Sequence, residues 1–172
     1  MTIRRLRPKD IPAVAAIIQR NYSRRYARLA TAELQEMFGQ SCIKPLYFVA
    51  ECDGGIVGVA GCMQSWMDYH VYTIFWVNVV PEKQRQGIGK ALLAKILEVV
   101  RKRGASLALL TTSVPTYYAR QFGFRTVARF WQKNGHQLMA LPLEHSHKRI
   151  PWSGQTATVS GQWRTKRTLT LR

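Results

Sequence analysis

The sequence predicts a single α/β domain in which helices flank a mixed, mostly antiparallel β-sheet. Two pairs of apolar segments, residues 46–52 with 56–63 and residues 125–131 with 136–141, are each joined by a short turn and predict antiparallel hairpins. Between the two pairs, an apolar segment, a helical pattern and another apolar segment follow one another, which is typical of a right-handed parallel crossover. A chain of 172 residues, 47% of them hydrophobic, is long enough for one core.

The N-terminal part predicts one strand and two helices. Residues 2–7 alternate loosely in polarity and predict a strand. Asp10 stands where it can cap a first helix, whose apolar residues recur at helical spacing as far as Tyr22. Thr31 is expected to cap a second, shorter helix over residues 32–38, which a glycine closes.

The central part predicts a buried strand followed by a strongly amphipathic helix. Residues 71–80 are apolar almost throughout, as expected of a central strand covered on both faces. The helix begins after Gly87 and ends at Gly104, and its apolar stripe contains Ile88, Leu92, Ile96 and Val99. Residues 107–110 predict the next strand. Thr116 is expected to cap a short helix that ends before the last hairpin.

The loop between the central strand and its helix has the composition of an anion site. It contains Gln84, Arg85, Gly87 and Gly89, and the helix continues with Lys90. Glycines let the backbone approach a phosphate closely, and the first turn of a helix has unpaired N–H groups at the positive end of its dipole. Together they predict a pyrophosphate site, to which the basic side chains add charge.

The segment Gln84-Arg85-Gln86-Gly87-Ile88-Gly89, with Val79 and Pro81 before it, resembles the acetyl-CoA signature of the GCN5-related N-acetyltransferases, the GNAT superfamily. The resemblance covers residues 2–143 and predicts an N-acetyltransferase domain over residues 1–143. It implies the GNAT fold, with two central parallel strands that splay where the cofactor enters. It also implies direct transfer of an acetyl group from acetyl-CoA to an amine of a small molecule, protein or peptide.

The resemblance also implies which residues hold the cosubstrate. Main-chain atoms of the central strand are expected to hold the pantetheine arm and the thioester, and these belong to Val77, Asn78 and Val79. The pyrophosphate is expected to lie on Arg85, Gln86, Gly87, Ile88, Gly89 and Lys90. In the family, the first two helices border the acceptor pocket, so Tyr22, Tyr26 and Phe38 are candidate acceptor contacts, with core packing as their alternative role. No metal site is predicted.

The proton donor to the leaving thiolate is expected to be Tyr118. Many members of the family carry a tyrosine four residues before the glycine of a Gly-Phe pair, but that position here is Ala119, and Tyr118 lies five residues before Gly123. A shift of one residue rotates a helical side chain by about 100°, which one extra residue at the helix end would offset. Tyr117 is the fallback, and aromatic packing under the cofactor is the alternative role of Tyr118.

The general base is not identified from the sequence. Some members place a glutamate on one of the two central strands, but residues 71–80 and 105–113 contain no acidic residue. Asp68, His70, Tyr72 and a water relay all remain open. The missing acidic base and the shifted tyrosine motivate an alternative function, a non-catalytic acyl-CoA-binding regulatory module.

Charge and composition bear on the partners. The formal net charge is +17, and such a field attracts polyanions and disfavours a cationic acceptor at long range. A basic protein that binds a phosphorylated cosubstrate is favoured over a nucleic-acid-binding or ribosome-associated role. Three cysteines in apolar segments, the lack of a signal peptide and the lack of a 20-residue apolar run predict reduced core thiols and a cytoplasmic protein without a membrane partner. A homodimer is left open.

Residues 144–172 lie outside the resemblance. They carry six Lys and Arg residues and one acidic residue, interleaved with Trp152 and Trp163, without helical periodicity. A basic C-terminal extension that is disordered or loosely docked is the favoured prediction. Basic residues with interleaved aromatics also occur in RNA-binding segments, which is the alternative. His145 and His147 are too few for a metal site.

Overall fold

The strands form one sheet. The structure, a computed structural model, describes residues 1–129 and 135–143. Within these ranges the sheet has seven strands in the order β1-β2-β3-β4-β5-β7-β6, and the pair β4–β5 is parallel while the other pairs are antiparallel. The mixed, mostly antiparallel sheet is therefore confirmed. The strands are β1 (Thr2–Arg5), β2 (Leu46–Cys52), β3 (Gly55–Gln64), β4 (Val71–Val79), β5 (Leu107–Thr112), β6 (Arg125–Arg129) and β7 (Gln137–Pro142).

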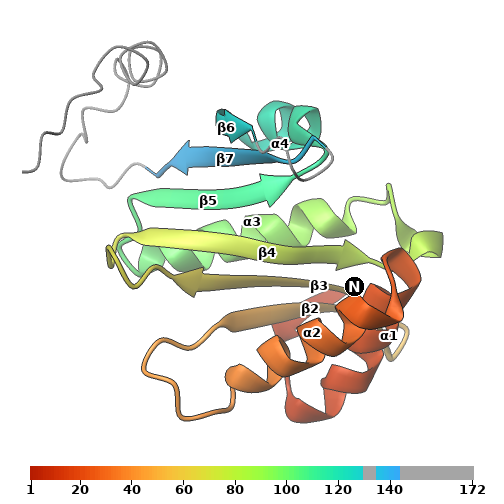
Figure 1. The fold of residues 1–172 in the computed structure, drawn as a ribbon. Coiled ribbons are helices and arrows are strands. Elements are labelled where there is room, and N and C mark those ends of the chain that lie inside the picture. The colour runs from red at the N-terminus through yellow and green to blue at the C-terminus, as the bar shows by residue number, and fades with distance from the viewer. Residues whose placement is uncertain (130–134, 144–172) are drawn as a thin grey trace, which may run out of the picture.

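Helices cover both faces of the sheet (Figure 1). α1 and α2 lie on one face and α3 on the other, and α3 connects the two parallel strands. α4 follows β5 and packs Tyr118 and Phe122 against the cluster on the α3 face. The helices are α1 (Ile11–Asn21), α2 (Arg24–Glu36), α3 (Ile88–Lys102) and α4 (Pro115–Phe122), with the 3₁₀ turns η1 (Pro8–Asp10) and η2 (Pro81–Lys83).

Side chains of β2 point alternately to the two faces of the sheet, which explains why helices cover both faces. Leu46 and Phe48 point into the cluster that contains α3, whereas Tyr47 and Val49 point into the cluster that contains α1 and α2. All four side chains are buried. A strand without a polar face needs an apolar layer on each side, and the three long helices provide these layers.

The central strands separate at one end, as the resemblance implies. Parallel pairing runs from Val71–Leu107 to Ile74–Leu110 and stops there, although β4 continues to Val79. Toward its carboxyl end, β4 visibly diverges from β5 (Figure 1). Beyond Ile74, β4 is therefore paired only with β3 among the described strands.

A β-bulge lies in the part of β4 that has left β5. Val59 pairs with Asn78 and Gly61 pairs with Phe75, so β4 has one more residue than β3 between these pairs. Trp76 occupies the bulge with a φ of 52°, a left-handed conformation that is unusual for a large side chain. The bulge turns adjacent residues of β4 toward different surroundings.

The predicted start of the second helix was wrong. α2 begins at Arg24, where the Ser23 hydroxyl accepts a hydrogen bond from the Tyr26 N–H at 3.4 Å. Thr31 lies inside the helix and donates its hydroxyl to the Ala27 carbonyl at 2.8 Å. The helix is longer than expected because nothing in its arginine-rich first half breaks it, and because its buried side of Ala27, Ala30 and Leu34 is made largely of small residues.

Three further expectations need correction. Asp10 precedes α1, but its side chain does not cap that helix; it pairs with Arg4 and accepts the Arg7 N–H at 2.8 Å. Thr116 lies inside α4, whose N-cap is Val114. Of the three free cysteines, Cys62 is buried, but Cys52 is only half-buried and Cys42 is exposed, so the prediction of three core thiols was wrong.

Some expectations cannot be compared with the structure. The extension 144–172, with its proposed RNA-binding alternative, lies outside the described residues, as do Trp131 and most of the turn between β6 and β7. None of the helices in the described ranges combines the length and the apolar composition needed to cross a membrane.

Candidate active site

A cleft of about 710 Å³ lies where β4 has left β5. It brings together segments that are far apart in the sequence: the end of α1, the carboxyl end of β4, the following loop, the start of α3, and α4. Its lining includes Asn21, Tyr22, Val77, Asn78, Val79, Lys83, Gln84, Arg85, Gly87, Gly89, Lys90, Val114, Tyr117, Tyr118 and Gln121. Eight of the ten residues that the sequence implicates in cosubstrate binding or catalysis are among them.

The loop before α3 presents backbone N–H groups to the cleft. Arg85 has a φ of 61° and Gly87 a φ of 83°, and Gly87 is the N-cap of the 15-residue helix α3. Glycine has no side chain that could accept the first-turn N–H groups, so these groups have no side-chain cap, and Gly87, Gly89 and Lys90 at this positive end of the helix line the cleft. Arg85 and Lys90 add positive charge beside them. This arrangement suits a phosphate or pyrophosphate group.

Two side chains from other elements hold the end of β4. Asn21 Nδ2 donates to Asn78 Oδ1 and to the Val79 carbonyl, both at 3.0 Å, and Gln84 Nε2 donates to the same carbonyl at 3.1 Å. Asn78 is only 5% exposed, and its Nδ2 has no hydrogen-bond partner among the described residues. A buried donor without a partner at a cleft wall is available to a ligand acceptor.

Tyr118 lines the cleft from α4. Its ring packs at 5.2 Å from the Tyr117 ring and at 6.1 Å from the Phe124 ring, centroid to centroid. Burial, and to a smaller extent the neighbouring Tyr117 and Tyr22, raises the pKa of Tyr118 to about 12. The phenol is therefore protonated at neutral pH and can donate a hydrogen bond into the cleft. Tyr117 lines the same cleft, so the fallback donor is not excluded by position.

Two of the implicated residues do not reach the cleft with their side chains. Ile88 is 5% exposed and belongs to the core cluster under α3. Gln86 donates its Nε2 to the Glu82 carbonyl at 3.3 Å. For Ile88 this follows from the geometry of the first helical turn, in which only part of the circumference faces the cleft, whereas Gln86 lies in the loop before the N-cap Gly87. Any contact of these two residues with a phosphate would have to come from the main chain.

None of the side chains left open as general base lines the cleft. Asp68 and His70 lie in the exposed loop between β3 and β4, with Asp68 Oδ1 and His70 Nδ1 3.4 Å apart. Tyr72 is 3% exposed and belongs to the core cluster on the α3 face. The position of these groups leaves a water relay as the remaining candidate among those that the sequence suggests.

The candidate acceptor contacts separate into two places. Tyr22 lines the cleft, and its ring lies 5.6 Å from the Tyr26 ring and 6.3 Å from the Trp76 ring. Phe38 instead lines a different, open pocket next to Pro8 and the start of α1. Tyr22 and Tyr26 therefore border the bulge of β4, whereas Phe38 does not.

Asn21 and Glu33 take part in contacts at the site that no sequence pattern predicts. Asn21 is 57 residues from Asn78, and no local pattern points to the pair. Glu33 accepts a hydrogen bond from the Trp76 indole N–H across a separation of 43 residues. Gln84 is part of the signature, but its hydrogen bond to the end of β4 could not be foreseen.

Comparison with known proteins places the chain in a family. The model of the acetyltransferase (GNAT) family matches residues 11–124. An uncharacterized N-acetyltransferase from Archaeoglobus fulgidus is 36% identical over 78 residues, which are 43% of this chain and 53% of that protein. The match thus spans about half the length of this curated relative.

Solved structures share the fold. An acetyltransferase assigned to the GNAT family from Desulfovibrio desulfuricans superposes with a TM-score of 0.73 at 23% identity, covering 82% of this chain and 98% of that one. An aminoglycoside 6'-N-acetyltransferase complexed with coenzyme A superposes with a TM-score of 0.69 at 16% identity, covering 84% of this chain and 99% of that one. The PaiA N-acetyltransferase from Thermoplasma acidophilum, also in complex with coenzyme A, superposes with a TM-score of 0.67 at 17% identity, covering 83% of this chain and 98% of that one. With the family model matching most of its length, this chain belongs to the acetyltransferase (GNAT) family.

Proposed function

We propose that this protein is an N-acetyltransferase that uses acetyl-CoA as cosubstrate and transfers the acetyl group directly to an amine. One observation carries the proposal: a single cleft combines the free end of β4, the uncapped start of α3 and a protonated tyrosine on α4. Each of these features meets one need of the reaction. The family membership and the neighbours crystallised with coenzyme A support the choice of cosubstrate.

In this proposal the loop and α3 bind the phosphates. The first-turn N–H groups after Gly87, together with the side chains of Arg85 and Lys90, supply donors and positive charge for the pyrophosphate. The main chain of Val77 to Val79 borders the cleft next to this loop, where it can hydrogen-bond the amides of the pantetheine arm. Asn78 Nδ2 adds a buried donor on the same wall.

The transfer step balances without any further reactant. The nitrogen of a neutral amine attacks the thioester carbonyl carbon, a C–N bond forms and the C–S bond breaks. One proton of the amine is lost and one proton is taken up by the coenzyme A thiolate, so the products are the acetamide and the free thiol. Backbone N–H groups at the bulge of β4 are suited to stabilise the negative charge that develops on the carbonyl oxygen.

Tyr118 is the proposed hydrogen-bond donor to the leaving sulfur. A thiol has a reference pKa of about 8.5, well below the value of about 12 that burial gives the phenol. Full proton transfer from this phenol to the thiolate would therefore be uphill. The hydroxyl is better suited to stabilise the thiolate through a hydrogen bond while the proton arrives through water.

Turnover measurements test the proposed function. Release of coenzyme A thiol and formation of an acetylated product, identified by mass spectrometry, should both depend on added amine in a one-to-one ratio. Tyr118→Phe should lower kcat by about 100-fold with little change in the KM for acetyl-CoA. Tyr117→Phe is the matched control on the same helix and should retain most of the activity.

Two outcomes would count against the proposal. Tight acetyl-CoA binding without transfer to any amine in a broad panel would favour the non-catalytic acyl-CoA-binding module. Equal losses in Tyr118→Phe and Tyr117→Phe would remove the specific role of Tyr118 and leave aromatic packing as the function of both rings.

A further inference from the structure

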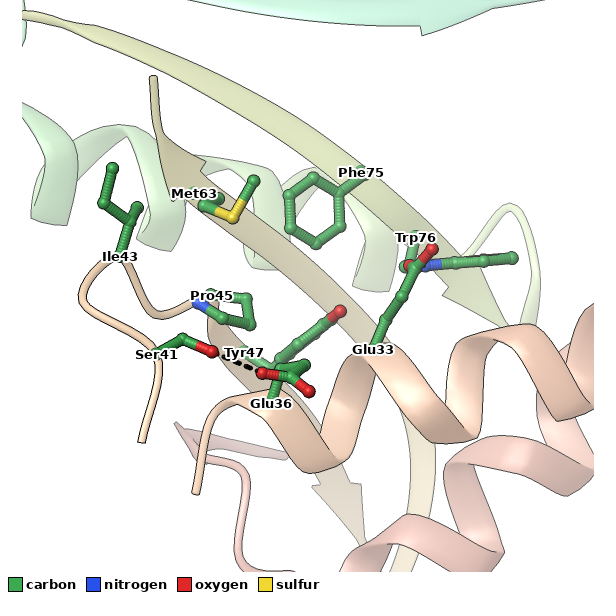
Figure 2. A pocket seen from close by; sticks show the side chains of 9 residues that line it. All are labelled: Glu33, Glu36, Ser41, Ile43, Pro45, Tyr47, Met63, Phe75 and Trp76. Carbon is green, nitrogen blue, oxygen red and sulfur yellow. Dashed lines mark hydrogen bonds between the residues drawn. The ribbon is translucent and has the colours of Figure 1, made fainter. Parts of the chain in front are cut away.

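A second cavity, of about 600 Å³, lies on the opposite face of the sheet from α3, between α2 and the strands β2, β3 and β4 (Figure 2). Its walls are partly aromatic and apolar, with Tyr47, Met63, Phe75 and Trp76 among the lining residues. A cavity of this size and character is typical of small-molecule sites. We name it the α2 cavity.

The α2 cavity is locally acidic in a strongly basic protein. Glu33 and Glu36 both line it, and they are two of only nine acidic residues, against 26 lysines and arginines. At a spacing of three they lie on the same side of α2. Among the described residues, no lysine, arginine or histidine lines the cavity, and neither carboxylate forms an ion pair. The carboxylates accept hydrogen bonds from the Trp76 indole and the Ser41 hydroxyl, both neutral donors.

Tyr47 provides a second, independent indication of a ligand. The residue is completely buried, yet its hydroxyl has no hydrogen-bond partner among the described residues. Figure 2 shows the side chain extending from β2 into the space bounded by Phe75 and Glu33. Burial, and secondarily the charge of Glu33, raises the pKa of the Tyr47 phenol, so the hydroxyl stays neutral. An unpartnered buried hydroxyl costs stability unless a ligand satisfies it.

The α2 cavity and the proposed acetyl-CoA cleft are both lined by residues at the bulge of β4. Trp76 lines the cavity, and the next residue, Val77, lines the cleft. Tyr22, another residue of the cleft wall, has its ring 6.3 Å from the Trp76 ring. A molecule in the cavity would therefore lie beside the segment of β4 that is proposed to hold the thioester.

We propose that the α2 cavity binds the acetyl acceptor, and that the acceptor is a small organic amine with at least two basic nitrogens. The proposal rests on the proposed function. The reacting nitrogen must give up its positive charge before it attacks, so carboxylates gain most from a second nitrogen that stays protonated. The aromatic walls also favour a cation with an apolar chain.

This acceptor class differs from the one that the net charge suggests. A field from a charge of +17 disfavours cations at long range, which on its own points to neutral or anionic acceptors. At contact distance, the nearest charges dominate, and in the α2 cavity these are Glu33 and Glu36. The local chemistry of the cavity therefore decides the acceptor class.

Two amines of equal length test the proposal on the full-length protein. 1,4-Diaminobutane and butylamine differ in the second ammonium group, and both are assayed with saturating acetyl-CoA. The wild type should acetylate the diamine with a kcat/KM about 10-fold or more above that of butylamine, mainly through a lower KM. Calorimetry with the coenzyme A complex should show the same order of affinities without any turnover.

Matched variants then assign the effect to the cavity. Glu33→Gln keeps an oxygen that can accept the Trp76 indole hydrogen bond but removes the charge, and Glu36→Gln does the same for Ser41. The double variant should bring the diamine-to-monoamine ratio close to one. Tyr47→Phe should weaken diamine binding several-fold while the melting temperature stays equal or rises. Glu98→Gln, on the outer surface of α3, is the charge control and should leave the ratio unchanged.

The outcomes separate this inference from the proposed function. Equal kcat/KM values for the two amines in the wild type, or a ratio that survives the double variant, would overturn the acceptor assignment while acetyl transfer stands. Failure of the wild type to bind acetyl-CoA would overturn the proposed function, and the acceptor role of the cavity with it.

Discussion

Gly61 is the residue that makes room for the aromatic wall of the α2 cavity. A Cβ atom at this position would lie 2.5 Å from Tyr47 Cε1 and 2.7 Å from Phe75 Cε2. Both are atoms of rigid rings whose centroids are 5.6 Å apart in an edge-to-face arrangement. The small size of Gly61 is therefore required by close packing, because its backbone conformation is an ordinary one.

Replacement of Gly61 should disturb this wall. Gly61→Ala should lower the free energy of unfolding by about 1–3 kcal/mol, since the rings cannot move apart without leaving their packed positions. Chemical denaturation measures the change. Gly55→Ala, at the start of the same strand, is the control, because its Cβ would meet only the Cys52 carbonyl oxygen at 3.7 Å. Equal stability of the two variants would show that the rings adjust freely.

Asp10 ties the first strand to the start of α1. Its carboxylate is 5% exposed and receives two hydrogen bonds from the Arg4 guanidinium, at 2.6 and 3.0 Å, and one from the Arg7 N–H. The hydrogen bonds from Arg4 outweigh the opposing effect of burial and lower the pKa of Asp10. The ionised form is thus more favoured in the folded protein than in the unfolded chain.

This interaction should make stability depend on pH. A lowered folded-state pKa contributes stability that is fully present above the unfolded value of about 3.9. This contribution is lost as the pH falls below that value and through the lower folded-state pKa of Asp10. Asp10→Asn should therefore cost about 1–3 kcal/mol at pH 7 and less at pH 3. Denaturation curves at both pH values provide the measurement, with Asp53→Asn in the exposed turn as the control. A cost independent of pH would contradict the role assigned to the charge.

At the scale of elements, α2 shows where local patterns mislead. Its buried side of Ala27, Ala30 and Leu34 consists mostly of small residues, so the apolar stripe is weak, and its first turn is basic. The sequence pattern therefore indicates Thr31 as the N-cap. The structure places the N-cap at Ser23, about two turns earlier.

A pair of substitutions distinguishes the two positions. Ser23→Ala should lower the free energy of unfolding by about 0.5–1 kcal/mol through loss of a cap. Thr31→Ala should be neutral or slightly stabilising, because alanine is the better residue inside a helix. Thermal unfolding of both variants checks this. The reverse order of effects would mean that the helix begins at Thr31.

Other elements could be predicted because their signals are local. The hairpin of β2 and β3 follows from the Asp53-Gly54-Gly55 turn, in which Asp53 and Gly54 have positive φ values. The helix α3 follows from its apolar period and from the glycine at each end. The contacts of Asn21 with β4 and of Glu33 with Trp76 could not be predicted, because packing of α1 and α2 on the sheet creates them.

For the molecule as a whole, the sequence predicts the cleft better than it predicts the acceptor. The phosphate loop is one continuous segment, so its residues lie together by necessity. The α2 cavity takes its residues from a helix, a loop and three strands, and its acidic character is hidden by the net charge of +17. A count of charges cannot show that two of the few carboxylates share one cavity.

The central claim is that the cleft beside β4 binds acetyl-CoA through the start of α3. Gly89 lines this cleft, and a Cβ there would meet only Val79 Cγ2 at an ordinary 3.7 Å, so a small side chain fits without strain. Gly89→Asp brings a negative charge to the proposed phosphate position, and a carboxylate in the first turn also suits the folded helix. Gly89→Asn has the same size without the charge.

Calorimetric titration of acetyl-CoA into the wild type and these two variants is the most direct test. The wild type should bind with micromolar affinity, Gly89→Asn somewhat more weakly, and Gly89→Asp at least about 10-fold more weakly than Gly89→Asn. Absence of binding by the wild type, or equal affinities of the two variants, would contradict the account.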